Sequence, residues 1–328
     1  MDDRRVWLDR LRSPAVGLVV CLMATVALYA PHVLSAGFVY EDLNDINTTY
    51  RPWQGVAVEL HDAVVRPARA LTRAVDRSIG LHPMRQHAAS LGWHLIAGLL
   101  FWRVVQGLLG PWQAVFAVGL FWLAPWQTEA VAYAAARADV LMTVAVLAGL
   151  WAVRTDQIAL AWGAAVAAIL AKETGVVAWL LLPAFAWWLG RAWSMRWKMA
   201  WTLTMIGGFL AALATREPDT AQLLPVVAVH GLTQLAGLLL TPPWALTIDP
   251  APASIWALAG CVVIALAIWR ASSGLALAVV GGLVLAWLPR ILVPLQEPPH
   301  FHHLYLPATL LSLGLARLFQ KGPLTNGD

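Results

Sequence analysis

Three carboxylates lie close together where a long apolar run ends. The stretch "GFVYEDLNDINTTYRPW", residues 37–53, contains Glu41, Asp42 and Asp45 in a chain of which only 12% is charged. A carboxylate beside an acceptor hydroxyl is a usual general base in group transfer. Two interpretations stay open at this point: the acids only mark the end of a membrane span, or one of them acts as a base. We expect Asp45 to cap the helix that follows.

Charged residues also interrupt two later apolar stretches. "APWQTEAVAYAAARADVL" contains Glu129, Arg137 and Asp139, and "LAKETGV" contains Lys172 and Glu173. A charge at the centre of a membrane helix costs roughly 2.5–3.5 kcal/mol, so such residues usually face one another or a cavity. Two interpretations stay open. In the first, these charges are structural: Arg137 pairs with Asp139 or Glu129 and fixes a broken helix, and Lys172 and Glu173 are ordinary residues of the membrane interface. In the second, Arg137 and Lys172 bind a phosphate.

A histidine cluster precedes the last apolar run. "EPPHFHHLYLP", residues 297–307, places three histidines within four positions. This density suggests a metal site, but the segment is rich in proline and lacks a suitably spaced carboxylate partner. A divalent metal therefore stays open but is not favoured, and the sequence indicates no definite cofactor.

The composition indicates that all these groups belong to a membrane protein. Of 328 residues, 60% are hydrophobic and 19 are tryptophan. Apolar runs near the roughly 20 residues needed to cross a bilayer recur along the chain. A net charge of +4 is explained by basic residues near anionic headgroups, so membrane lipids rather than nucleic acid are the expected partners. Cys21 and Cys261 lie in apolar runs, which argues against a disulfide framework.

We predict an all-α polytopic protein of about ten transmembrane helices, with one domain over residues 1–320 and a short tail at 321–328. The spans cover about 14–35, 87–108, 111–125, 137–153, 157–171, 174–190, 198–214, 253–270, 274–292 and 304–319. Lysine and arginine in the connections on one side place both termini in the cytoplasm. With both termini in the cytoplasm, residues 221–240 must dip into the outer leaflet without crossing the membrane. If they crossed it, the orientation of the helices that follow would be inverted.

The first outer loop, about residues 36–86, is predicted to contain an interfacial helix. Arg66, Arg69, Arg73 and Arg77 recur at helical spacing, with Pro67 in the first turn and Gly80 at the end. Two interpretations stay open here as well: simple headgroup contact, or attraction of an anionic lipid phosphate to the site.

Taken in order, these motifs resemble one family over about residues 36–319. "FVYEDLNDI" with "YRPW" is similar to its "DD…N…YRPL" opening, and "LHPMRQHAASLGWHLIAGLLF" to its histidine-containing second span. "APWQTEAVAYAAARADVL" is similar to "P…EAV…R.D", "LAKETGV" to "KE.G", "LLTPPWALTIDP" to "P..LS.D" and "HHLYLPA" to "ERYLYLPS". The family is that of the transmembrane O-mannosyltransferases with tetratricopeptide tails and their bacterial relatives, within the glycosyltransferase-C superfamily.

The resemblance implies inverting transfer of a hexose, mannose or a near relative, in a bacterial inner membrane. The donor would be a polyprenyl-phosphate sugar, and the acceptor a hydroxyl of a protein, lipid or glycan outside the cytoplasm. The implied base is Asp42 or Glu41. Implied donor-phosphate or lipid contacts are Arg51, Arg137, Lys172 and His302, and implied supporting residues are Glu129, Asp139, Glu173, His87, His94 and Tyr305.

The chain also departs from the family pattern. Glu41 replaces the first aspartate, Gly92 or a neighbour replaces the asparagine before His94, and His302 stands where the family has arginine. We also expect no tetratricopeptide tail. The alternative function is therefore a non-catalytic subunit that binds or translocates a lipid carrier during glycan assembly.

Overall fold

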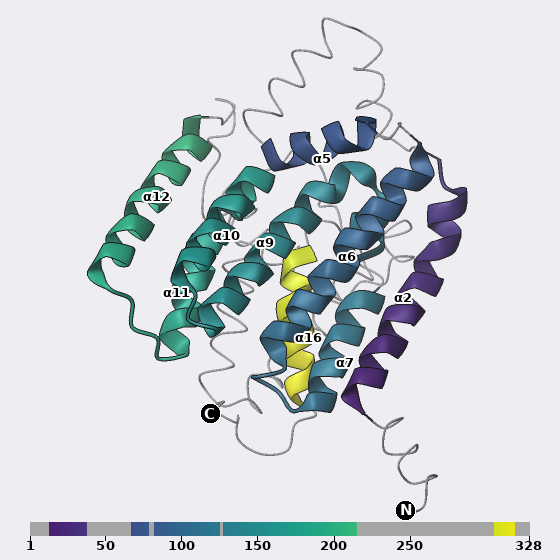
Figure 1. Ribbon diagram of the computed structural model, residues 1–328, viewed down its shortest axis with the longest axis horizontal. Coiled ribbons are helices and arrows are strands. Elements are labelled where there is room, and N and C mark those ends of the chain that lie inside the picture. The colour runs from purple at the N-terminus through teal and green to yellow at the C-terminus, as the bar shows by residue number, and fades with distance from the viewer. Residues whose placement is uncertain (1–12, 38–66, 79–81, 125–126, 215–304, 319–328) are drawn as a thin grey trace, which may run out of the picture.

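The computed structural model describes residues 13–37, 67–78, 82–124, 127–214 and 305–318, and every regular element in these ranges is helical (Figure 1). The longer helices are α2 (Pro14–Ser35), α5 (Pro67–Ser78), α6 (Pro83–Val105), α7 (Pro111–Leu123), α9 (Arg137–Arg154), α10 (Ile158–Ala171), α11 (Ala178–Trp188), α12 (Met195–Ala214) and α16 (Tyr305–Leu318). Short helical turns are α8 (Thr128–Ala132), η2 (Ala134–Ala136) and η3 (Glu173–Val177). The all-α prediction is confirmed for this part of the chain.

Most of the predicted spans coincide with described helices, whereas those at 253–270 and 274–292 lie outside the described residues. By length and apolarity α2 and α6 are each able to cross a bilayer, with 22 and 23 residues. Other apolar helices are shorter, such as α7 with 13 residues and α10 with 14. The count of ten crossings stays a prediction.

Proline and serine define where several helices begin. Pro14, Pro83 and Pro111 each occupy the first turn of a helix, where the missing N–H costs no hydrogen bond. Ser13 caps α2, and its hydroxyl oxygen accepts from the Val16 N–H at 3.4 Å. The starting points of α2, α6 and α7 are therefore determined by the local sequence.

Helix α9 lies inside the bundle and packs against α6, α10, α11 and α16. Most of its side chains are buried, including Val140, Val146 and Leu147, although it carries charges at both ends. The facing side of α10 is made of alanines, Ala161, Ala165 and Ala168, all fully buried. Small side chains let two helix backbones approach closely, which is the usual basis of helix association in membranes.

The helix ends form two chemically different ends of the bundle. At one end, which we call the polar end, α2 finishes, α6 and α9 begin and α10 finishes. Here a ring nitrogen of His32 lies 3.1 Å from the carbonyl oxygen of Ala132. At the opposite end, which we call the basic end, the Arg154 guanidinium donates to the Arg103 carbonyl and the Arg191 guanidinium to the Arg154 carbonyl.

Helix α5 lies across the polar end, in contact with α9 and α10 (Figure 1). It begins at Pro67, in agreement with the predicted helix of the first outer loop. Ala68 packs against the apolar cluster of α9, α10 and α11. Its location at a membrane surface stays a prediction.

We predict that Gly175→Ala destabilises the fold whereas Gly163→Ala does not. A methyl group on Gly175 would overlap the backbone carbonyl of Ala168, whereas no atom lies within 4 Å of the corresponding position at Gly163. Overpacking of this kind costs about 1–3 kcal/mol, and alanine in an open helical position gains up to about 1 kcal/mol over glycine. The free energy of unfolding, measured by SDS titration in dodecylmaltoside, checks both values. Equal stability of the two variants would contradict the close approach at Gly175.

Candidate functional site

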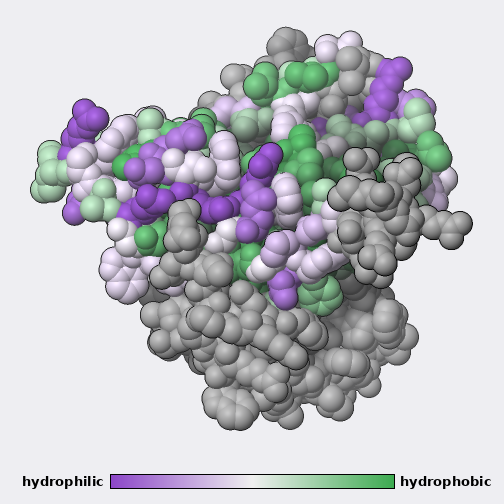
Figure 2. Space-filling view, turned by 60° about the horizontal axis from the view of Figure 1, so that its bottom comes forward, coloured by the Kyte–Doolittle hydropathy of each residue, from purple (hydrophilic) through white to green (hydrophobic). Residues whose placement is uncertain are grey.

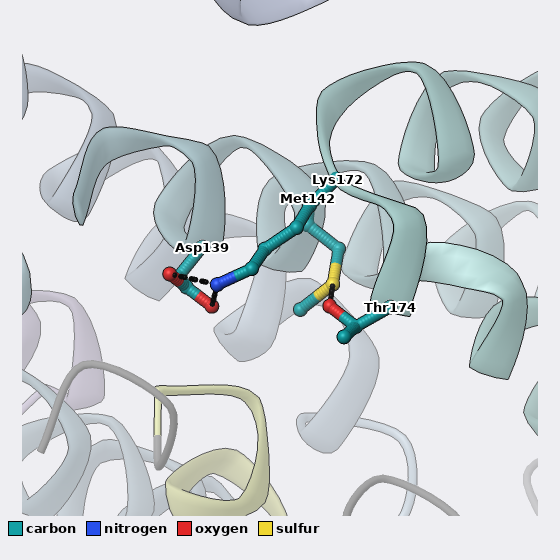
Figure 3. Close-up of polar contacts among 4 residues, drawn as sticks. All are labelled: Asp139, Met142, Lys172 and Thr174. Atoms are coloured by element: carbon teal, nitrogen blue, oxygen red, sulfur yellow. Dashed lines mark hydrogen bonds and ion pairs between the residues drawn. The ribbon is translucent and has the colours of Figure 1, made fainter. Parts of the chain in front are cut away.

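A buried ion pair joins α9 to the end of α10 at the polar end. The Lys172 ammonium nitrogen lies 2.8 Å from Oδ1 and 2.7 Å from Oδ2 of Asp139 (Figure 3). The two side chains are only 9% and 6% exposed. Asp139 lies in the first turn of α9 and Lys172 directly follows α10, so each charge is the one that its helix dipole favours. The pair therefore fixes two antiparallel helix ends in one register.

The local sequence "LAKETGV" explains why Lys172 points into the bundle. Helix α10 ends because Lys172 adopts an extended backbone, and the Gly175 N–H then donates to the Lys172 carbonyl at 2.8 Å. The hydroxyl of Thr174 lies 3.3 Å from the sulfur of Met142, one turn after Asp139 on α9 (Figure 3). Two side-chain contacts thus hold this turn against α9.

Arg137 begins α9 and binds the start of α6. Its Nη2 donates to the carbonyl oxygen of Gln86 at 2.9 Å and lies 3.4 Å from the side-chain oxygen of the same residue. Its Nε donates to the hydroxyl of Ser90 at 3.3 Å. Arg137 is only 2% exposed, so a guanidinium is buried beside the Asp139–Lys172 pair in sequence and at the same end in space.

The carboxylate of Asp139 binds Lys172, a pairing that the sequence interpretation did not include. Arg137 and Asp139 are two positions apart on one helix, and residues at that spacing do not face each other. The helix is interrupted at the extended residue Tyr133, between α8 and the turn η2 that precedes α9, and the pairing of Arg137 with Asp139 or Glu129 stays a prediction. Glu129 lies half-buried on α8, which packs against α6 and α9. Its predicted role toward Arg137 stays a prediction.

His94 joins three helices in the interior. Its Nε2 donates to the carbonyl oxygen of Trp122 at 3.1 Å, which leaves Nδ1 to accept from the hydroxyl of Tyr305 at 2.5 Å. The indole N–H of Trp122 donates back to the His94 carbonyl at 3.2 Å. His94, Trp122 and Tyr305 are all fully buried. This network connects α6, α7 and α16, and it fixes a neutral tautomer of His94 by geometry.

His87 connects the end of α2 to the start of α6. Its Nε2 lies 3.3 Å from the carbonyl oxygen of Gly37, and its ring packs edge-on against His32 at 4.8 Å between centroids. Gly37 is the first residue of the carboxylate-rich stretch. The chain therefore enters that stretch at the polar end, the same end that holds Arg137.

The structure brings together only part of the predicted site. Asp139 and Lys172 touch, Arg137 and His87 lie at the same end, and His94 and Tyr305 lie deeper in the bundle. The predicted residues Glu41, Asp42, Arg51 and His302, and the side chain of Glu173, lie outside the described residues. Within the described part of the chain, no group of three or more histidine, cysteine or carboxylate side chains could hold a metal ion.

Sequence reasoning named His94 as a supporting residue but missed Gln86 and Ser90, the α6 partners of Arg137. Gln86, Ser90 and His94 recur at every fourth position of α6, and all three are buried. A polar stripe at this spacing on an otherwise apolar helix is the signal that would have indicated them. Two of these side chains hold Arg137 and the third holds Tyr305.

Comparison with known proteins gives one partial match. No protein-family model matches the chain, and neither does any solved structure. The chain is similar to "Protein O-mannosyl-transferase Tmtc1" of Drosophila melanogaster, with 31% identity over 189 residues, covering 50% of this chain and 22% of that protein. The chain thus spans less than a quarter of its relative. The resemblance to O-mannosyltransferases is confirmed in part, and the superfamily assignment stays a prediction.

We predict that removing one partner of the Asp139–Lys172 pair destabilises the fold far more than removing both. Asp139→Asn or Lys172→Met alone leaves an uncompensated buried charge, which costs about 3–5 kcal/mol. The double variant Asp139→Asn/Lys172→Met removes both charges and should recover most of that loss. A double-mutant cycle on the free energy of unfolding checks this. Additive losses in the double variant would show that the two side chains are not coupled.

Proposed function

We propose that this protein is an integral-membrane glycosyltransferase that moves a hexose, mannose or a near relative, from a polyprenyl-phosphate sugar to a hydroxyl acceptor. The observation that carries the proposal is the assembly of Arg137, Asp139 and Lys172 at one end of the bundle from two separate motifs. The partial similarity to an O-mannosyltransferase supports it. The acceptor is a protein, a lipid or a glycan.

The buried cations suit a lipid phosphate. The leaving group is already an anion when its bond to the sugar breaks, so it needs cationic partners rather than protonation by a strong acid. Hydrogen bonds to Gln86 and Ser90 fix the orientation of the planar guanidinium of Arg137, a group whose geometry suits phosphate oxygens. Lys172 directs two bonds to Asp139 and so acts first as a positioning residue. Arg51 and His302 are further candidates for the phosphate.

The proposed base is Asp42 or Glu41. The carboxylate takes the proton of the acceptor hydroxyl as the acceptor oxygen attacks the anomeric carbon. The bond from that carbon to the phosphate oxygen breaks, and the polyprenyl phosphate leaves with the electron pair, which inverts the anomeric centre. Glu41 and Asp42 follow Gly37 by four and five residues, so they lie within about 18 Å of it by covalent reach alone. Gly37 contacts His87 at the polar end.

The basic end supports an orientation with the site outside the cytoplasm. Arg103, Arg154 and Arg191 meet at the end opposite Arg137. Cytoplasmic loops carry an excess of arginine and lysine. We therefore place the basic end and both termini in the cytoplasm of a bacterial cell, and the polar end on the outer face of its inner membrane.

We predict that Asp42→Asn or Glu41→Gln abolishes sugar transfer, while the matched control Asp45→Asn retains it. Loss of a general base lowers the rate by about 10²–10⁴-fold. The assay uses liposomes with purified full chain, polyprenyl-phosphate carrying tritiated mannose, and solubilised membranes of the source cells as the acceptor pool. Radioactivity that moves from the carrier lipid to acceptor measures transfer. Full activity in both variants would exclude Glu41 and Asp42 as the base. If the native chain bound the carrier lipid without transferring the sugar, the carrier-binding alternative would be favoured.

A second prediction separates the phosphate role of Arg137 from its packing role. Arg137 and Arg154 lie at opposite ends of α9, and each donates to carbonyls of α6. Arg137→Lys should weaken binding of polyprenyl phosphate by about tenfold or more, since a charge-assisted hydrogen bond contributes about 1.5–3 kcal/mol. Arg154→Lys should leave that affinity unchanged while costing similar stability. Native mass spectrometry of lipid titrations gives the affinities. Equal weakening by both variants would mean that Arg137 acts only through packing.

A further inference from the structure

The basic end carries a concentration of cations that the proposed reaction does not use. Its cationic side chains are Arg103, Arg154, Arg191, Arg196 and Lys198, and the acid among the described residues there is Asp156. Figure 2 shows hydrophilic side chains gathered in a band across the face formed by this end of the bundle. Among the described residues at this end, arginine and lysine therefore outnumber acids.

Two of these cations hold the helix ends together. The half-buried Arg154 donates to the carbonyl oxygens of Arg103 and Val104 at the end of α6. Arg191 donates to the carbonyl oxygen of Arg154 at 3.1 Å, at the end of α9. Cations that bind the last carbonyls of a helix are favoured by its dipole. These hydrogen bonds hold the ends of α6 and α9 and the segment after α11 side by side. The other cations are attached to this fixed end of the bundle.

Tight turns keep the cations close to the apolar helix ends. Asp156 has a φ of 59° after α9 and Gly190 a φ of 68° after α11. In both places the backbone N–H of the next residue donates to a carbonyl of the preceding helix. The Gln157 N–H donates to the Ala152 carbonyl and the Arg191 N–H to the Ala186 carbonyl, each at 2.8 Å. Chain reversals of this kind end a helix within one turn. The charges therefore lie beside apolar surface.

The exposed cations border exposed aromatic and apolar side chains. Arg103 lies over the ring of Trp102 at 5.4 Å, and Arg196 over the ring of Trp197 at 5.9 Å. Large apolar side chains at the same end are also exposed: Trp187 at 76%, Met195 at 70% and Met199 at 55%. Tryptophan and arginine at such a boundary are typical of the headgroup level of a bilayer. A ligand that fits this surface has an anionic head and an apolar body.

We infer that the basic end is a binding surface for anionic phospholipids. Headgroup phosphates of separate lipids lie at Arg103 on α6 and at Arg196 and Lys198 on α12, and the acyl chains lie along exposed apolar side chains such as Trp187, Met195 and Met199. A free phosphate ion would use the cations but not the apolar side chains, so the exposed apolar surface favours the lipid. This inference depends on membrane insertion and not on glycosyl transfer, and its failure would leave the proposed reaction untouched.

The test compares phosphatidylglycerol with phosphatidylcholine on the purified full chain in dodecylmaltoside, with bound lipid counted by native mass spectrometry. The variant Arg103→Gln/Arg196→Gln/Lys198→Gln removes three exposed cations, and the Arg103 carbonyl that holds Arg154 stays in place. The matched control is Arg85→Gln, an exposed arginine on the same helix α6, about 27 Å away along the axis.

The native chain should prefer phosphatidylglycerol, and each lost cation should weaken that preference about fivefold. The triple variant should therefore lose it almost completely, the Arg85→Gln control should keep it, and inorganic phosphate at millimolar concentration should not compete. If the triple variant does not fold, the single variants Arg103→Gln and Arg196→Gln should each show the fivefold loss. An unchanged preference in these variants, an equal loss in Arg85→Gln, or competition by inorganic phosphate would overturn the inference.

Discussion

The buried ion pair between Asp139 and Lys172 is the interaction on which the arrangement of the polar end depends. A charge away from water is tolerated only when it is paired, so α9 and α10 must meet in the register that brings these side chains together. With both carboxylate oxygens within 2.8 Å of one ammonium nitrogen, little freedom remains. The alanine face of α10 permits the close approach, and Gly175 permits the turn that follows. Packing and electrostatics therefore specify the same geometry.

Much of the described fold could be predicted from the sequence because apolar runs and helix-starting prolines are local signals. The beginning of α2 at Pro14 and of α5 at Pro67 follows from residues within one turn. The Asp139–Lys172 pairing could not be predicted in this way, because it links positions on different helices. The alternative pairing of Arg137 with Asp139 or Glu129 stays a prediction. The catalytic prediction for Glu41 and Asp42 stays a prediction, since both lie outside the described residues.

The polar stripe of α6 shows how one helix serves both structure and site. Gln86 and Ser90 hold Arg137, while His94, one turn further into the bundle, holds Trp122 and Tyr305. Polar groups buried together are stable only when each has a partner. The stripe therefore couples the position of Arg137 to the packing of α16 through a single rigid helix.

The two arginines of α9 differ in their position relative to the helix dipole. Both donate to backbone carbonyls of α6, at opposite ends of the bundle. Arg154 lies at the C-terminus of α9, where the helix dipole favours a cation, so helix stability accounts for its charge. Arg137 lies at the N-terminus, where the dipole favours an anion, and it is only 2% exposed. Asp139 in the same turn offsets part of this charge but directs both oxygens to Lys172. The proposed phosphate role of Arg137 fits this position, because a bound anion would meet the guanidinium and the positive end of the helix together.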